Sequence, residues 1–207
     1  MDEPLSLTLL YTGGIAGDLA LLPRLFTFLQ RLKAAAPPPA LLLDLGGSCA
    51  DDIPHCRETG GRSTLIALDG MGYDAANIAG QLDREQREGL AEQVTLGLVD
   101  EERDWLFQPL PDGAGSIGAT LRPRDDSARL QILLKPAGST RIAGNVLFLQ
   151  AVDAGQVGAV AIDLRGEPKL VSARIHEMPA ATPANASIAG MVEFVEAEAR
   201  LLGRKRG

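Results

Sequence analysis

The sequence predicts an α/β fold in which helices pack on mixed β-sheets. Two observations carry this prediction. In roughly the first hundred residues, short apolar runs of strand length alternate with segments whose apolar residues recur at helical spacing. This alternation is typical of parallel strands joined by helical crossovers. Later in the chain, closely spaced apolar runs follow one another with a short turn at 165–167, which indicates an antiparallel hairpin.

In the first half we expect three strands and three helices. The apolar runs 5–11 and 40–43 and the shorter run 73–78 are typical of buried strands. The helix after the first strand carries apolar residues at helical spacing, namely Leu22, Leu25, Phe26, Leu29 and Leu32, and prolines 37–39 end it. A polar loop is expected over 46–62. Ser63 is expected to cap the second helix, and Asp83 with Gln86 to begin the third as a capping box.

The second half is expected to be richer in strands. Residues 108–128 contain many Pro, Gly and Asp residues, which favours an irregular excursion. Strands are expected at 130–134, 146–152, 157–164 and near 169–175, and apolar spacing then predicts a closing helix over residues 188–202. The Trp105–Phe107 cluster is expected to be a small apolar anchor. We find no repeat or linker, so 1–207 is expected to form a single domain.

Composition excludes some function classes. Of the 207 residues, 45% are apolar and 23% are charged, as in an ordinary soluble globular protein. The net charge of −7 argues against nucleic acid as a main partner. The acidic start and the absence of a long apolar run argue against an export signal or a membrane span. Two cysteines do not make a secreted disulfide framework, so we expect a cytoplasmic protein.

Four segments then carry a family resemblance. They are Leu9–Gly17 (LLYTGGIAG), Leu42–Gly47 (LLDLGG), Met71–Ala75 (MGYDA) followed by Ala79–Leu82 (AGQL), and the closing hairpin from Val146 to Ala173. In this order they resemble the calcineurin-like metallophosphoesterases, specifically the 5′-nucleotidase branch. The match covers roughly the first 83 and the last 60 residues, and a shortened, divergent middle of about 84–145 separates them. The resemblance implies a layered α/β-β-α sandwich with mixed parallel and antiparallel sheets.

The resemblance also implies a lost metal site. In the family, aspartate, histidine and asparagine side chains hold two divalent metals and a histidine assists the reaction. The corresponding residues of this chain are Gly14, Ala16, Gly47, Gly80 and Gln81. Neither His55 nor His176 falls on a family ligand position. We therefore expect a non-catalytic member with no cofactor, which binds a protein partner or a small anionic ligand in the old cleft.

A glycine-rich loop is the candidate anion site. Backbone N–H groups between a strand and a helix can cradle a phosphate. The candidate residues are Gly13, Gly14, Gly17, Asp18, Gly46 and Gly47. The alternative is that these glycines only permit tight turns, with Asp18 favouring the helix dipole.

Two further functions stay open. An active phosphoesterase would need a divalent metal at a rebuilt site. Its candidate ligands are Cys49, Asp51, Asp52, His55 and Cys56. The spacing matches no standard zinc pattern, so we expect a solvated loop with two free thiols. We assign Asp44 and Asp74 structural roles and expect His176 to be exposed. The remaining possibility is a structural subunit of a larger assembly, with Trp105 on a partner surface.

Overall fold

The computed structural model describes residues 6–107, 115–124 and 128–206. Within these ranges the chain forms strands and helices in the order β1 (Ser6–Thr12), α1 (Leu22–Ala35), β2 (Ala40–Asp44), α2 (Pro54–Thr59), α3 (Arg62–Gly70), β3 (Ala75–Asn77), α4 (Arg84–Ala91), β4 (Gly97–Val99), β5 (Trp105–Phe107), β6 (Ile117–Thr120), β7 (Leu130–Ala137), β8 (Arg141–Ala143), β9 (Val146–Gln150), β10 (Gln156–Asp163), β11 (Lys169–Glu177) and α5 (Ala186–Arg206).

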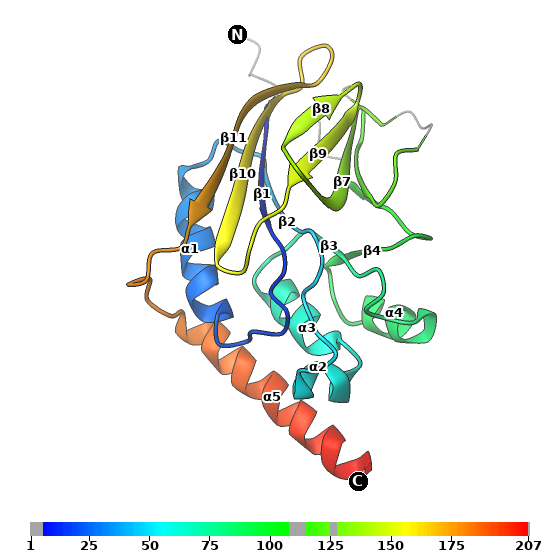
Figure 1. The fold of residues 1–207 in the computed structure, drawn as a ribbon, viewed down its shortest axis with the longest axis vertical. Helices are drawn as coiled ribbons and strands as arrows, with labels where there is room; N and C mark the ends of the chain where they lie inside the picture. The colour runs from blue at the N-terminus through cyan, green and yellow to red at the C-terminus, as the bar shows by residue number, and fades with distance from the viewer. Residues whose placement is uncertain (1–5, 108–114, 125–127, 207) are drawn as a thin grey trace.

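The strands form two mixed sheets (Figure 1). The first sheet has the order β11-β10-β1-β2-β3-β4, and β1 to β4 run parallel. β10 pairs antiparallel with β1, and β11 closes the hairpin at the edge. The second sheet has the order β5-β6-β7-β9-β8. The expected α/β class, the parallel first half and the closing hairpin are therefore confirmed.

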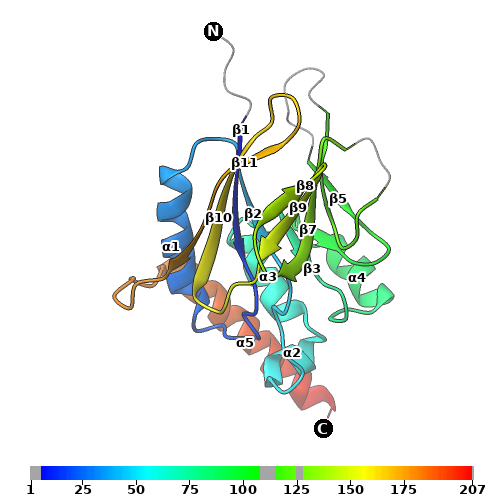
Figure 2. The same ribbon diagram turned by 45° about the horizontal axis from the view of Figure 1, so that its top comes forward.

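Alternating side chains of β1 and β2 divide the core into two layers. Leu9 and Leu43 are buried between the two sheets with apolar residues of β6, β7 and β9. Their neighbours Leu10 and Leu42 point to the opposite face and pack with residues of α1, α3 and α5, because successive residues of a strand face opposite sides. Figure 2 shows α1 and β7 to β9 on opposite sides of the first sheet.

The short elements correct several predictions. The expected polar loop over 46–62 contains α2, and the expected excursion over 108–128 contains β6, while 108–114 and 125–127 lie outside the described residues. Ser63 is not a cap: α3 begins at Arg62, with Gly61 at the N-cap in a left-handed conformation at φ 83°. The capping box at Asp83 is confirmed, since its carboxylate accepts a 2.8 Å hydrogen bond from the Gln86 N–H.

The Trp105 cluster lies on the short strand β5. Trp105 and Phe107 stack with ring centroids 5.7 Å apart and pack on the core between the sheets, whereas Leu106 is 57% exposed.

Among the described helices, none is long and apolar enough to cross a membrane.

The parallel strands end at one edge of the first sheet. The loops after β1, β2 and β3 meet there with α2, at the lower end of the molecule in Figure 1. In open α/β sheets, ligands bind in the crevice outside the carboxyl ends of the strands. The fold therefore directs attention to this edge.

Candidate functional site

A pocket of about 500 Å³ opens at this edge of the sheet. Its walls come from the loop after β2, from α2, from the turn before α3, from the loop after β3 and from the first turn of α4. The lining residues are Gly47, Cys49, Ala50, Asp51, Cys56, Arg57, Gly60, Gly61, Ala79, Gly80, Gln81 and Gln86. Asp51 and Arg57 are the charged residues among them. The pocket is therefore polar and nearly balanced in charge.

The positions that the resemblance assigns to metal ligands lie in or beside the pocket. Gly47, Gly80 and Gln81 line it, and Gly14 is adjacent, since a Cβ on Gly47 would lie 3.5 Å from the Gly14 Cα. Ala16 lies in the same loop as Gly14 and is exposed. Glycine and alanine supply no side-chain oxygen or nitrogen, so these positions do not fit a two-metal cage.

Gln81 carries the one polar side chain of that set, and its amide is already bonded. Its Nε2 donates to the Gly61 carbonyl at 2.8 Å, and its Oε1 accepts from the Ser48 hydroxyl at 2.8 Å. Gln81 therefore ties the loop after β2 to the turn before α3. No sequence pattern indicated this bridging role.

The glycine-rich loop after β1 uses its N–H groups within the protein. Gly14, Ala16 and Gly17 donate to the carbonyls of residues 46, 47 and 48 at 2.9, 2.7 and 2.9 Å. The Asp18 carboxylate accepts from the Leu21 N–H at 3.1 Å. Six residues were candidates for an anion cradle: Gly13, Gly14, Gly17, Asp18, Gly46 and Gly47. Gly47 is the member of this set that lines the pocket. The three N–H groups donated to carbonyls are not available to an anion in this arrangement.

Cys49 and Cys56 form a disulfide, so the expectation of two free thiols was wrong. The reason is α2, which the sequence did not reveal. This helix begins at Pro54 and brings Cys56 back toward the loop after β2, with the two Cα atoms 5.7 Å apart, within the range that a disulfide spans.

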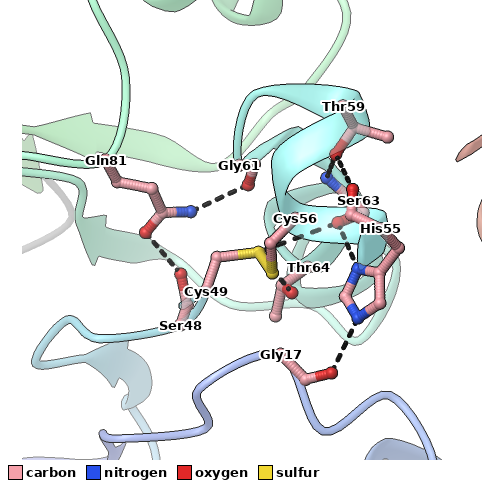
Figure 3. The surroundings of a disulfide bond; sticks show 10 residues. All are labelled: Gly17, Ser48, Cys49, His55, Cys56, Thr59, Gly61, Ser63, Thr64 and Gln81. Carbon is pink, nitrogen blue, oxygen red and sulfur yellow. Dashed lines mark hydrogen bonds between the residues drawn. A yellow bond between two sulfur atoms is a disulfide. The ribbon is translucent and has the colours of Figure 1, made fainter. Parts of the chain in front are cut away.

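Hydroxyl and imidazole groups surround the disulfide (Figure 3). Cys49 Sγ lies 3.2 Å from the Thr64 hydroxyl and 3.7 Å from the Ser63 hydroxyl. His55 Nδ1 lies 2.7 Å from the Ser63 hydroxyl, and His55 Nε2 lies 2.8 Å from the Gly17 carbonyl oxygen. Because a carbonyl only accepts, Nε2 carries the hydrogen, and in the neutral ring Nδ1 accepts from Ser63.

The candidate metal ligands are brought together only in part. Ligand atoms of Cys49, His55 and Cys56 lie within 4.8 Å of one another. Asp51 and Asp52 are exposed and lie outside that group. Metals bind thiolates, not disulfide sulfurs, and both His55 nitrogens already have partners. In this oxidised form the five residues do not fit a metal site.

A second polar cluster lies at the ends of β1 and β2. Asp44 is fully buried, and its carboxylate accepts from the Thr12 hydroxyl at 3.2 Å and from the Gly46 N–H at 2.9 Å. Tyr73 lies 2.9 Å from the Thr12 hydroxyl. Burial raises the pKa of Asp44 to about 7, although these two hydrogen bonds act in the opposite direction.

The remaining titratable candidates lie away from the pocket lining. Asp74 accepts from the Leu42 N–H at 2.7 Å, a contact that joins β2 to the turn before β3. Both it and Asp44 therefore have the structural contacts we expected. His176 was predicted to be exposed, but it is half-buried beside α1.

Solved structures with a similar fold include nucleotidases. No family model and no curated protein matches the chain. The 5′-nucleotidase precursor of Thermus thermophilus superposes with a TM-score of 0.66 at 13% identity, over 95% of this chain and 59% of that one. The NAD nucleotidase of Haemophilus influenzae gives 0.58 at 11% identity, over 99% and 60%. A putative 5′-nucleotidase from Staphylococcus aureus gives 0.60 at 9% identity, over 93% and 58%.

The chain thus spans about three fifths of the length of these three structures. At such low identities the likeness concerns the fold alone. Together with the sheet order and the parallel strand ends, it shows that the chain has the metallophosphoesterase fold of the 5′-nucleotidases.

Proposed function

We propose that the chain is a non-catalytic domain of 5′-nucleotidase fold that binds a small anionic ligand in the pocket beside α2. The observation that carries the proposal is the lining itself. The pocket is present at the strand ends, yet Gly47, Gly80 and Gln81 stand where the resemblance places metal ligands. Such a site has room for a ligand and lacks side chains that would hold two metals and activate water.

Arg57 is the cation that supports an anionic ligand. Its side chain is 62% exposed, and its neighbour Glu58 lies 3.4 Å away in a surface ion pair, which contributes little to stability. A guanidinium binds phosphate or carboxylate oxygens through paired N–H groups. Because the structural neighbours are nucleotidases by name, a nucleoside phosphate is the first ligand class to test.

The binding test is calorimetric titration of the protein with AMP, NAD and inorganic phosphate. Arg57→Gln is expected to weaken binding about tenfold, because a charge-assisted hydrogen bond is lost. Arg200→Gln is the matched control, since Arg200 is 65% exposed and also pairs with a nearby glutamate. Equal affinities for both variants, or no binding of any of the three compounds, would reject the anionic ligand and leave a protein partner.

The catalytic alternative has its own test. Metal-stripped protein is mixed with a generic phosphomonoester or phosphodiester, and Mn²⁺, Mg²⁺, Zn²⁺ or Ni²⁺ is added back. We expect no turnover with any of these metals. Metal-dependent turnover that disappears in Asp51→Ala or Asp52→Ala would instead establish a phosphoesterase with a rebuilt site.

A further inference from the structure

The binding proposal leaves the disulfide and its neighbours unused. We propose that the Cys49–Cys56 disulfide is a redox centre that exchanges with a small thiol entering the pocket, and that Cys49 is the sulfur attacked. The proposal goes beyond anionic-ligand binding, because it assigns a chemical reaction to the same pocket.

Access favours attack at Cys49. Both cysteines contribute to the pocket lining, but Cys56 is only 3% exposed while Cys49 is half-buried. In thiol–disulfide exchange, the rate depends on which sulfur an incoming thiolate can reach. The sequence contains no cysteine besides these two, so each is the other's only intramolecular partner.

Two buried hydroxyls lie beside the same sulfur. Thr64 and Ser63 are fully buried, and their hydroxyls lie 3.2 and 3.7 Å from Cys49 Sγ. A disulfide sulfur is a weak acceptor, whereas a thiolate accepts strongly, so these donors favour the reduced form of Cys49. The Thr64 hydroxyl is thus placed for the thiolate that reduction produces rather than for the disulfide.

Ser63 extends this arrangement to His55. In the neutral ring, Ser63 donates to His55 Nδ1 at 2.7 Å. The Ser63 hydrogen is therefore directed at His55, and Thr64 is left as the hydroxyl donor to Cys49 Sγ. Ser63 and His55 join α3 to α2 beside the disulfide.

The reaction has two steps. A thiolate from a low-molecular-weight thiol attacks Cys49 Sγ, the S–S bond breaks, and Cys56 Sγ leaves with the electron pair and takes up a proton. This gives a mixed disulfide between the small thiol and Cys49. A second thiolate attacks the small-molecule sulfur of that mixed disulfide and releases Cys49 as a thiolate beside Thr64. Two thiols are oxidised to one disulfide, and the protein disulfide gains the two electrons.

The first measurement compares the two single-cysteine variants in their folded state. Cys56→Ser and Cys49→Ser are each incubated with glutathione disulfide, and mixed disulfides are followed by mass spectrometry. Cys56→Ser, which keeps Cys49, is expected to react at least tenfold faster than Cys49→Ser, which keeps the buried Cys56. Equal rates, or reaction of both variants only in denaturant, would overturn the proposal.

The second measurement tests the Thr64 hydroxyl in the intact protein. Thr64→Val is expected to slow the second step, the release of the Cys49 thiolate, and therefore to slow complete reduction of the wild-type disulfide by glutathione several-fold. Thr27→Val is the matched control, because the Thr27 hydroxyl, on α1, bonds the Pro23 carbonyl. A Thr64→Val rate equal to that of Thr27→Val would contradict the assignment.

Zinc is the remaining outcome to measure. If reduced protein binds one Zn²⁺ through Cys49, His55 and Cys56 and no longer forms the mixed disulfide, the cluster is a metal site and the redox proposal fails. The readout is thiol chemistry and zinc content, so failure here is distinct from a failure to bind AMP, NAD or phosphate.

Discussion

Two polar clusters lie at the same end of the parallel strands, and they differ in whether any member lines the pocket. The sealed cluster consists of Thr12, Asp44 and Tyr73, which are 1%, 0% and 3% exposed. The open cluster consists of the disulfide, Ser63 and Thr64 with His55, beside a pocket that Gln81 helps to line. The sealed side chains come from the ends of β1 and β2 and from the turn after α3, whereas the open ones come from the loop after β2, from α2 and from α3.

The difference separates structural from functional roles. In the sealed cluster, Thr12 donates to Asp44 and Tyr73 therefore donates to Thr12, so β1, β2 and the turn after α3 are joined without solvent. A ligand or thiol reaches only the open cluster. The buried carboxylate, although its pKa is strongly raised, is therefore a stability element, and the chemistry we propose belongs to the pocket.

The largest expected effect is the pH dependence of stability that Asp44 causes and that Asp44→Asn removes. The pKa of Asp44 is about 7 in the folded protein against 3.8 for the free group. A raised carboxyl pKa stabilises the fold fully below 3.8, and this contribution is lost as pH rises toward 7. Relative to Asp44→Asn, wild type should lose about 1.4 kcal/mol of unfolding free energy per pH unit in this window, as measured by urea denaturation at pH 5, 6 and 7.

Asp163→Asn provides the control for that series. Hydrogen bonds from Arg165 lower the pKa of Asp163 to about 2, so this carboxylate does not titrate between pH 5 and 7. Its variant should follow the wild-type slope. If Asp44→Asn also follows the wild-type slope, the carboxyl is not held neutral and the sealed cluster is hydrated.

The next effect concerns the disulfide of the open cluster. It closes a short loop, since the cysteines are separated by 7 positions, and loop-closure entropy for such a length corresponds to roughly 2–3 kcal/mol. The free energy of unfolding of the double variant Cys49→Ser/Cys56→Ser, measured by urea denaturation, should be lower by that amount. Dithiothreitol should lower the stability of wild type to the same level and leave the double variant unchanged. No loss in the double variant would show that other contacts hold the loop.

Much of the fold was predictable because its longer elements carry repeating patterns. The runs that became β1 and β2 are apolar on both faces, as strands between helices and a second sheet must be. Asp83 and Gln86 have the spacing of a capping box, and the structure forms it. By contrast, β5, β6 and β8 have 3, 4 and 3 residues, too few to show a period.

The open cluster was less predictable, because it depends on contacts distant in sequence. The six-residue helix α2 decides the pairing of Cys49 with Cys56, and nothing in the spacing of the cysteines required it. The resemblance directed us to Gly47, Gly80 and Gln81, and the pocket contains them. It did not indicate that Thr64 would lie against a sulfur, since that contact needs α3 to pack beside the loop after β2.

The smallest expected effect concerns Gln81, which bridges two walls of the pocket. Gln81→Ala removes the partners of the fully buried Ser48 side chain and of the Gly61 carbonyl. Unpaired buried groups of this kind cost about 1–2 kcal/mol, which urea denaturation resolves. Gln93→Ala is the matched control, because the exposed Gln93 amide bonds the Gly89 carbonyl in the last turn of α4, and it should cost less than about 0.5 kcal/mol. Equal losses of unfolding free energy in the two variants would mean that water replaces the Gln81 amide. The pocket walls at Ser48 and Gly61 would then be held by the disulfide and the backbone alone.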